Sequence, residues 1–221
     1  MEKDFEKIKE FWDNTFKNYI NDKIDYSYLE LAPSKKLVEE ILNIKDKDNV
    51  LDYGAGNGWA SLLLATNNKK VLAVDTSSNS IDVINNYAKH YGFNNIITKV
   101  IDSNWIYNNN LKFDAIVTSN VIDVLPDNIS KDILKFFYQS LNDSGILVVG
   151  MNYYIDPKQV KDIYDVKGNE IYIDNVLRMY SLSDEEWINE FNKYFNVIKL
   201  EHFMWPGEKK ELRRLFILNK K

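Results

Sequence analysis

The sequence predicts a single α/β domain built on a doubly wound, mostly parallel sheet whose C-terminal strand is antiparallel. Between residues 50 and 150, short β-branched runs alternate with helical stretches, a pattern typical of parallel strands joined by right-handed crossovers. The 221 residues suit one domain, and an apolar content of 45% is enough to fill its core. The chain contains no internal repeat or linker, so we expect one folding unit.

Two helices are expected before the sheet. Apolar residues recur at three- and four-residue spacings from about Asp4 to Tyr19, which predicts a helix with one apolar stripe. Pro33 and Ser34 are suited to start a second helix, and apolar residues continue at helical spacing to Leu42.

The sheet begins near residue 50. The expected strands are short and β-branched, and cover residues 50–53, 71–74, 95–101, 113–117 and 145–150. The expected helices between them cover residues 61–65, 81–91 and 129–141. Each strand is therefore followed by a segment that can carry the chain back across the sheet.

The C-terminal part has a different pattern. Extended runs on both sides of Gly168-Asn169 predict an inserted β-hairpin. The run from Ser183 to Glu186 fits a capping box, which predicts the start of a helix. Two extended runs, 195–203 and 211–219, end the chain, with a turn at Pro206-Gly207 between them.

The composition excludes several kinds of site and partner. The chain has no cysteine, which rules out disulfides, thiolate zinc sites and a cysteine nucleophile, and its two histidines lie far apart, so we expect no metal. The formal charge is −5 and the basic pairs are scattered, so no nucleic-acid partner is expected. The charged start and the lack of an apolar run of about 20 residues predict neither a secretory signal nor a membrane span. We expect a cytoplasmic monomer or homodimer.

A glycine-rich turn follows the first expected strand, in the run Asp52-Tyr53-Gly54-Ala55-Gly56-Asn57-Gly58. Gly54 and Gly56 allow a sharp turn and a close approach of the backbone to a ligand, and Gly58 lies where the next helix begins. The turn lies at the carboxyl end of a parallel strand, where open α/β sheets bind ligands. A tight turn without a ligand is the simpler alternative, but three glycines in five residues exceed what a turn requires.

The ligand is better explained as a cation than as a diphosphate. The nicotinamide fingerprint G-x-G-x-x-G places its third glycine where this chain has Trp59, and Asp52 would repel a pyrophosphate. The shorter pattern D-x-G-x-G-x-G resembles motif I of the class I methyltransferases that depend on S-adenosylmethionine (SAM). The resemblance implies a Rossmann-like fold with N-terminal helices and the inserted hairpin, with SAM as cofactor.

Further residues match this family from about Val50 to Gly150. The resemblance implies that Asp75, with Thr76 beside it, accepts hydrogen bonds from the ribose hydroxyls. It also implies that Asp102 approaches the adenine amino group while the backbone of Ser103 meets the ring edge. Asn120 lies in a segment that resembles motif IV, near the methionine part of the cofactor; Val121 and Ile122 replace the two prolines of the DNA amino-methylating enzymes. Trp105 either stacks on adenine or fills the core.

A general base is needed only if the acceptor must lose a proton early. Three residues near the expected mouth of the site are candidate catalytic groups, namely Asp123, Tyr153 and His202. Asp123 has an alternative role as a helix cap, and His202 has one as a packed or surface residue.

In this family the acceptor pocket is usually built from N-terminal helices and from insertions after the fifth strand. The resemblance therefore implies one domain with a helical lid over about residues 1–32, a cofactor-binding core over 33–155 and a substrate-side hairpin over 156–182. Both substrate-side regions are aromatic, and Tyr19 is expected to reach the cofactor. The aromatic residues expected near the acceptor are Phe11, Trp12, Phe16, Tyr153, Tyr154, Tyr172 and Tyr180, with Arg178 among them.

These features predict a SAM-dependent methyltransferase that acts on an oxygen, nitrogen or carbon atom of a small organic acceptor. A protein or RNA methyltransferase is one alternative, and it would require an open and basic mouth. A SAM-binding protein without catalysis is another. A nicotinamide-dependent oxidoreductase is disfavoured by Trp59.

Overall fold

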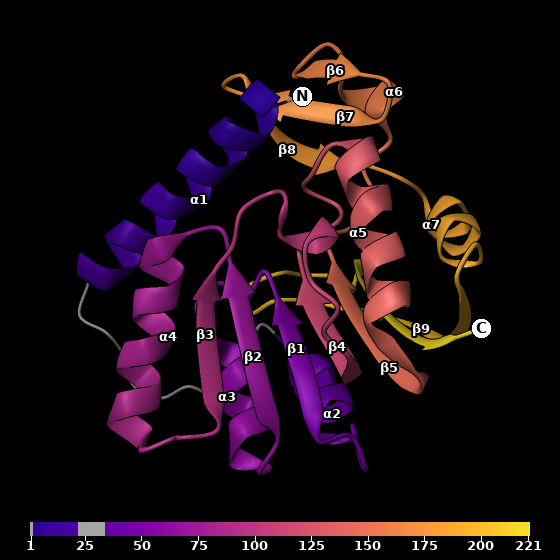
Figure 1. The fold of residues 1–221 in the computed structure, drawn as a ribbon. Helices are drawn as coiled ribbons and strands as arrows, with labels where there is room; N and C mark the ends of the chain where they lie inside the picture. The colour runs from indigo at the N-terminus through magenta and orange to yellow at the C-terminus, as the bar shows by residue number, and fades with distance from the viewer. Residues whose placement is uncertain (1, 22–33) are drawn as a thin grey trace.

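The computed structural model describes residues 2–21 and 34–221, and the side chains of residues 5–17 and 34–221. Its main element is a seven-stranded sheet in the order β3-β2-β1-β4-β5-β10-β9 (Figure 1). Strand β10 runs antiparallel to both of its neighbours, whereas β1 to β5 pair in parallel. The strands are β1 (Asn49–Tyr53), β2 (Lys70–Asp75), β3 (Ile96–Val100), β4 (Phe113–Ser119), β5 (Leu141–Met151), β9 (Phe195–Phe203) and β10 (Arg213–Lys220). The predicted fold class is therefore confirmed.

Helices cover both faces of the sheet, and alternating side chains of β10 show the two cores. Leu215 and Ile217 pack in a cluster with α2 and α3, whereas Phe216 and Leu218 pack in the cluster that contains α5 and α7. Helix α4 contacts α3 and covers the first face beside β2 and β3. The helices are α2 (Lys35–Leu42), α3 (Trp59–Thr66), α4 (Ser78–Tyr91), α5 (Asp127–Ser140) and α7 (Asp184–Phe191), with a short 3-10 helix η1 (Trp105–Tyr107).

The expected helix starts are present. Ser34 caps α2, since its hydroxyl accepts a hydrogen bond from the N–H of Lys36. The capping box at α7 is complete, because Ser183 and Glu186 each accept a hydrogen bond from the backbone N–H of the other. Among the described residues, no helix has the length and apolar content needed to cross a membrane.

The insertion after β5 forms a small three-stranded sheet rather than the two-stranded hairpin expected from the sequence. It contains α6 (Pro157–Val160), β6 (Asp165–Lys167), β7 (Glu170–Ile173) and β8 (Val176–Tyr180). The expected turn at Gly168-Asn169 joins β6 to β7. A second turn at Asp174-Asn175, with φ angles of 51° and 61°, adds β8. The hairpin prediction was therefore incomplete, because this two-residue turn of suitable residue types was overlooked.

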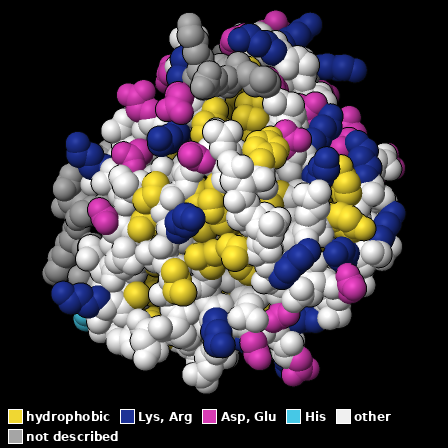
Figure 2. Space-filling model, viewed as in Figure 1, with side chains coloured by type: hydrophobic (Ala, Val, Ile, Leu, Met, Phe, Trp, Pro, Cys, Tyr) yellow, Lys and Arg dark blue, Asp and Glu magenta, His cyan; other side chains and the backbone are white. Residues whose placement is uncertain are grey.

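One face of the molecule, viewed as in Figure 1, has hydrophobic side chains in its middle and charged side chains of both signs around them (Figure 2). No single sign of charge dominates the part of this face that is described.

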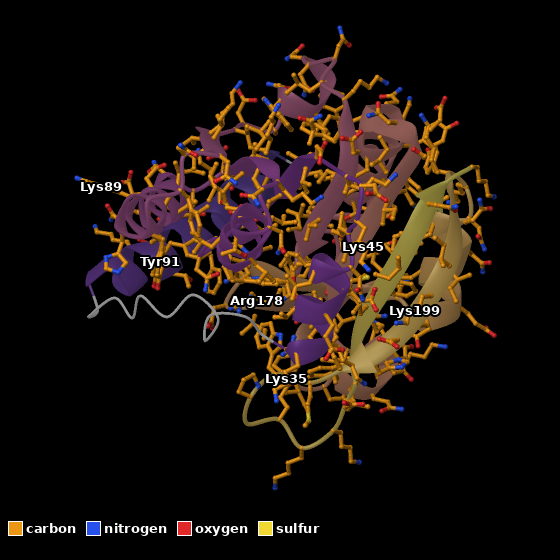
Figure 3. All side chains as sticks on the ribbon, turned by 90° about the horizontal axis from the view of Figure 1, so that it is seen from below. Lys35, Lys45, Lys89, Tyr91, Arg178 and Lys199 are labelled. Carbon is orange, nitrogen blue, oxygen red and sulfur yellow. The ribbon has the colours of Figure 1, made fainter. Side chains whose placement is uncertain are left out.

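Helix α1 (Glu2–Asn21) crosses above the carboxyl ends of the strands, from the small sheet to α4 (Figure 1). Near α4, the carboxylate of Asp13 accepts hydrogen bonds from the hydroxyl of Ser77 (2.6 Å) and the amide of Asn79 (2.9 Å). Near the small sheet, the guanidinium of Arg178, labelled in Figure 3, stacks on the ring of Phe11 at 3.9 Å. Helix α1 is therefore fixed at two places over the end of the sheet.

Candidate functional site

The glycine turn between β1 and α3 adopts a backbone that requires glycine. Gly54, Gly56 and Gly58 have φ angles of 69°, 55° and 82°, in the left-handed region. A Cβ atom on Gly54 would lie 2.3 Å from Val121, and one on Gly58 would lie 2.6 Å from Ile84 of α4. The turn is thus held closely between β4 and α4.

A cavity of about 480 Å³ opens above this turn, at the carboxyl ends of the parallel strands. Trp59 forms part of its wall without filling it, because the indole packs in the cluster with α2 and is 8% exposed. The cavity lies where the sequence predicted it. Its polar and glycine lining includes Asp52, Gly54, Gly56, Asn57, Asp75, Thr76, Asp102, Ser103, Ser119 and Asn120.

Asp52 is the penultimate residue of β1 and is 3% exposed. Its Oδ2 atom accepts a hydrogen bond of 2.5 Å from the hydroxyl of Ser61. Burial is the main reason that the pKa of its carboxyl rises to about 7, with a smaller opposing contribution from that hydrogen bond. A cation beside Asp52 would stabilise the ionised form.

Asp75 ends β2 and connects that strand to the glycine turn. Its Oδ2 atom accepts a hydrogen bond from the N–H of Gly56 (2.9 Å), and its Oδ1 atom accepts one from the N–H of Ser77 (2.9 Å). Burial raises the pKa of this carboxyl. A carboxylate has about four acceptor positions, and an oxygen that already accepts one hydrogen bond can accept another from a ligand.

Asp102 and Ser103 follow β3, and Asn120 follows β4, so all three reach the same end of the sheet. Asn120 has a φ of 54°, and its N–H donates to the carbonyl of Gly150 at 2.8 Å. Its Oδ1 atom is buried and has no hydrogen-bond partner in the described structure. Such an atom needs a donor, from a ligand or from water.

The cavity fits a positively charged ligand that also donates hydrogen bonds. Asp52 and Asp75 are both buried there, and neither forms an ion pair with a described basic side chain. A sulfonium compound with an ammonium and two ribose hydroxyls supplies charges and donors of this kind.

The three candidate catalytic residues are absent from the described lining of the cavity. Asp123 is fully buried; its Oδ2 atom accepts a hydrogen bond from the N–H of Asn152 at 2.7 Å, and burial raises the pKa of its carboxyl. Tyr153 lies beside the guanidinium of Arg213, at 5.8 Å. His202 lies on β9, with its Nε2 atom 3.0 Å from Asp184. A catalytic role for these residues remains a prediction.

The aromatic residues expected around the acceptor lie in different surroundings. Trp12 and Phe16 of α1 line the cavity, whereas Phe11 faces Arg178. Tyr172 and Tyr180 are buried in the larger core cluster. The side chain of Tyr19 lies outside the described residues, so its predicted contact with the cofactor is not described.

Trp105 fills the core. Its indole is 7% exposed, and it packs against Tyr53 and, edge to face at 5.3 Å, against Phe136. Of the two roles left open by the sequence, the structure therefore favours packing.

The lining also contains residues that were not predicted, among them Lys9, Trp205 and Pro206. Lys9 had a sequence signal, because it lies four residues after Phe5 and three before Trp12, on the same face of α1. Trp205 follows β9 and had none, since only the fold brings this turn back to the glycine loop. The guanidinium of Arg213 stacks on the Trp205 indole at 3.5 Å and holds it in place.

The strand order, the antiparallel β10 and the glycine turn with acids at successive strand ends together define a class I SAM-dependent methyltransferase. The profile of the methyltransferase domain family matches residues 26–203, and the chain belongs to that family. Its cofactor is therefore SAM.

Relatives and solved structures agree with this assignment. The chain is 33% identical over 114 residues to an rRNA adenine N-6-methyltransferase of Bacillus licheniformis; the match covers 50% of this chain and 38% of that enzyme. It is 23% identical over 142 residues to a protein-L-isoaspartate O-methyltransferase of Dictyoglomus thermophilum, covering 63% of this chain and 59% of the relative. The chain thus spans well under two thirds of the length of both relatives.

Two solved structures resemble the whole domain. The SAM-dependent methyltransferase of Clostridium acetobutylicum has a TM-score of 0.66 and 17% identity, with 94% of this chain and 96% of that chain covered. The structure described as a DhpI–SAH complex has a TM-score of 0.70 and 12% identity, with 100% and 98% covered. At these identities the likeness shows the fold.

Proposed function

We propose that this domain transfers the methyl group of SAM to a small organic acceptor bound beneath α1. The observation that carries the proposal is the lining of the cavity, which includes the glycine turn and the aromatic side chains Trp12 and Phe16 of α1. Such apolar and aromatic walls suit a small acceptor beside the cofactor, whereas a macromolecule needs a broad polar surface.

The proposed roles in cofactor binding follow from where the acidic residues lie. Asp52 would pair with the ammonium, and Asp75 with the ribose hydroxyls. The remaining proposed contacts are made by Gly54, Gly56 and Gly58 in the turn, Thr76 after β2, Asp102 and Ser103 after β3, Asn120 after β4, and Tyr19. Bound SAM supplies a methyl group already activated by a positively charged sulfur.

The protein then has to align the acceptor and exclude water. In the proposed division of the domain, α1 belongs to a lid over about residues 1–32, above a core over 33–155. Trp12 and Phe16 lie on the cavity side of this helix. The ring of Phe16 lies close to the glycine turn, since a Cβ atom added to Gly56 would be 3.3 Å from it. The insertion over about 156–182 supports the middle of α1, where Arg178 stacks on Phe11.

Charge supports a small acceptor over RNA. The chain carries a net charge of −5, and both signs are mixed on the face shown in Figure 2. An RNA-binding surface would concentrate lysine and arginine around the mouth of the cavity. Because one relative is an rRNA methyltransferase, the test below includes RNA among the acceptors.

The test has two stages, binding and transfer. Isothermal titration with SAM, S-adenosylhomocysteine (SAH) and NADH should show binding of the first two only. The protein is then incubated with methyl-labelled SAM and one of three acceptor mixtures, which are a metabolite extract, total RNA and a protein extract. We expect label in the metabolite fraction; label confined to RNA or protein would contradict the proposal, and SAM binding without any transfer would indicate a binding protein.

A further inference from the structure

Lys9 is a half-buried cation on the roof of the cavity. The cavity-facing stripe of α1 contains Phe5, Lys9, Trp12 and Phe16, at spacings of four, three and four residues. No described residue forms an ion pair or hydrogen bond with Lys9. A cation that lines a cavity and has no partner is available to bind an anionic ligand there.

The other ionisable groups of the described lining are poorly suited to take a proton from an acceptor. Asp52, Asp75 and Asp102 are those proposed to hold the cofactor. Burial raises the pKa of the Tyr53 phenol, so this group stays protonated near neutral pH. An acceptor whose attacking atom is already ionised needs no base.

We propose that the acceptor is a small monocarboxylic acid that is methylated on its carboxylate oxygen, with Lys9 holding the carboxylate. The inference rests on the proposed methyl transfer and names its substrate class. One anionic group accounts both for the unpartnered cation and for the absence of a suitable base from the described lining. A single lysine acts as a point charge, which matches a monoanion better than a phosphate dianion.

The reaction balances without any other reactant. A lone pair of the carboxylate oxygen forms the new oxygen–carbon bond to the methyl group. The sulfur–methyl bond breaks, and its electron pair stays on sulfur, so the sulfonium becomes a neutral thioether. The negative charge of the acid and the positive charge of the sulfonium disappear together, and no proton is released. The products are a methyl ester and SAH.

The walls of the cavity favour an acid with a flat, apolar body. Trp12 and Phe16 on α1 and Trp205 after β9 present aromatic surfaces to it. The backbone N–H of Trp205 donates to Glu208 at 2.9 Å, and Arg213 binds the same carboxylate, so this wall is rigid. Apolar walls also remove water from the carboxylate, which makes it more reactive.

The product identifies the atom that is methylated. The protein is incubated with methyl-labelled SAM and the acidic fraction of a metabolite extract, and the product is treated with alkali. A methyl ester releases its label as methanol, whereas ethers and methylamines retain it. Volatile label supports the inference; stable label overturns it while leaving methyl transfer intact. Transfer to no metabolite would instead overturn the proposed function.

Variants test the role of Lys9 separately. The probes are benzoate, phenylacetate and octanoate, each compared with its amide, bound to the protein in the presence of SAH. We expect the best-bound acid to bind more tightly than its amide, Lys9→Met to weaken that acid about 10- to 100-fold, and Lys9→Arg to retain most of the affinity. Lys17→Met, on the exposed side of α1, should change nothing.

Binding of SAM provides the decisive control. Lys9→Met should leave the dissociation constant of SAM within about twofold of the original value, because the proposal assigns Lys9 to the acceptor. Weakened SAM binding would make Lys9 a cofactor residue and overturn the inference. The same conclusion would follow if no acid bound more tightly than its amide.

Discussion

Buried charged side chains have different surroundings in two regions at this end of the sheet. At the ends of β1 and β2, Asp52 and Asp75 are buried without an ion-pair partner among the described basic side chains. At the start of β10, Arg213 and Arg214 are equally buried, but each has several partners. Arg214 donates to the carbonyls of Asn152 and Leu182 at 2.8 and 2.6 Å, and it faces Asp123.

This difference distinguishes buried charges that stabilise the fold from buried charges that are available to bind a ligand. The ion-paired arginines hold the segment after β5 against β10 and the insertion. Asp52 and Asp75 accept hydrogen bonds but have no ion-pair partner among the described residues, so they can pair with a cation from outside. We therefore expect substitutions on the β10 side to lower stability, and those on the β1–β2 side to lower cofactor affinity.

The largest expected effect is on the β10 side. Arg214→Met removes a guanidinium that is 1% exposed and leaves Asp123 buried beside an apolar side chain. We expect the free energy of unfolding, measured by urea denaturation, to fall by about 3 kcal/mol. Lys209→Met, at an exposed position, should change it by less than about 0.5 kcal/mol.

A second substitution distinguishes a charge effect from a packing effect. Adding Asp123→Leu to Arg214→Met removes the unpaired carboxyl, so part of the lost stability should return. If the double variant is less stable than Arg214→Met alone, the proposed charge compensation between these residues is wrong.

The second effect is on the β2 side. Asp75→Ala removes the proposed ribose contacts and the bond to the Gly56 N–H. We expect the dissociation constant of SAM, measured by calorimetry, to rise about 100-fold, or about 3 kcal/mol. Asp82→Ala, at an exposed position of α4, is the matched control and should bind normally. Unchanged binding by Asp75→Ala would remove this residue from the site.

The smallest effect is the pH dependence of cofactor binding. The free protein holds Asp52 with a pKa of about 7, and the proposed contact with the ammonium of SAM requires the ionised carboxyl. Protons therefore compete below pH 7, and the dissociation constant should rise by up to about tenfold per pH unit, while remaining level above pH 7. The Asp52→Asn variant should bind SAM weakly, and the increase in its dissociation constant below pH 7 that is due to this carboxyl should disappear.

The same pKa has the opposite consequence for the protein without cofactor. The folded pKa of Asp52 lies above the ordinary value of an aspartate, so its contribution to stability is present at low pH and is lost as the pH rises through about 7. Asp52→Asn should reduce the loss of stability between pH 5 and pH 8, measured as the urea midpoint. A larger loss in the variant would contradict the raised pKa.

The sequence predicted the cofactor end of the sheet because parallel topology places successive strand ends together. Once Asp52, Asp75, Asp102 and Asn120 were assigned to strand ends, their meeting at one edge followed from the fold class, and the structure brings all four to the cavity. The acceptor side was harder to predict, because part of its wall comes from the turn between β9 and β10. Only the antiparallel pairing of β10 brings this turn, which is distant in sequence, to the cavity.

Two particular errors show the limits of local patterns. Tyr172 and Tyr180 were expected near the acceptor, but both pack in the core cluster, because a register shift between Ile171 and Tyr172 interrupts the regular alternation along β7. Lys9 was overlooked because a charged residue in an apolar stripe resembles a solvated position. Its helical spacing from Phe5 and Trp12 contained the needed information.

The bond between Asp13 and Ser77 connects the roof to the adjoining helix. Ser77 is the N-cap of α4, and its backbone also donates to Asp75, so one short segment supports the helix, the β2 acid and the lid. An outward swing of α1 would break the bonds of Asp13 to Ser77 and Asn79 and would expose Ile8, which is buried in the main core cluster. Loss of these contacts would also disturb Asp75, so we expect a full cavity and a closed lid to reinforce each other.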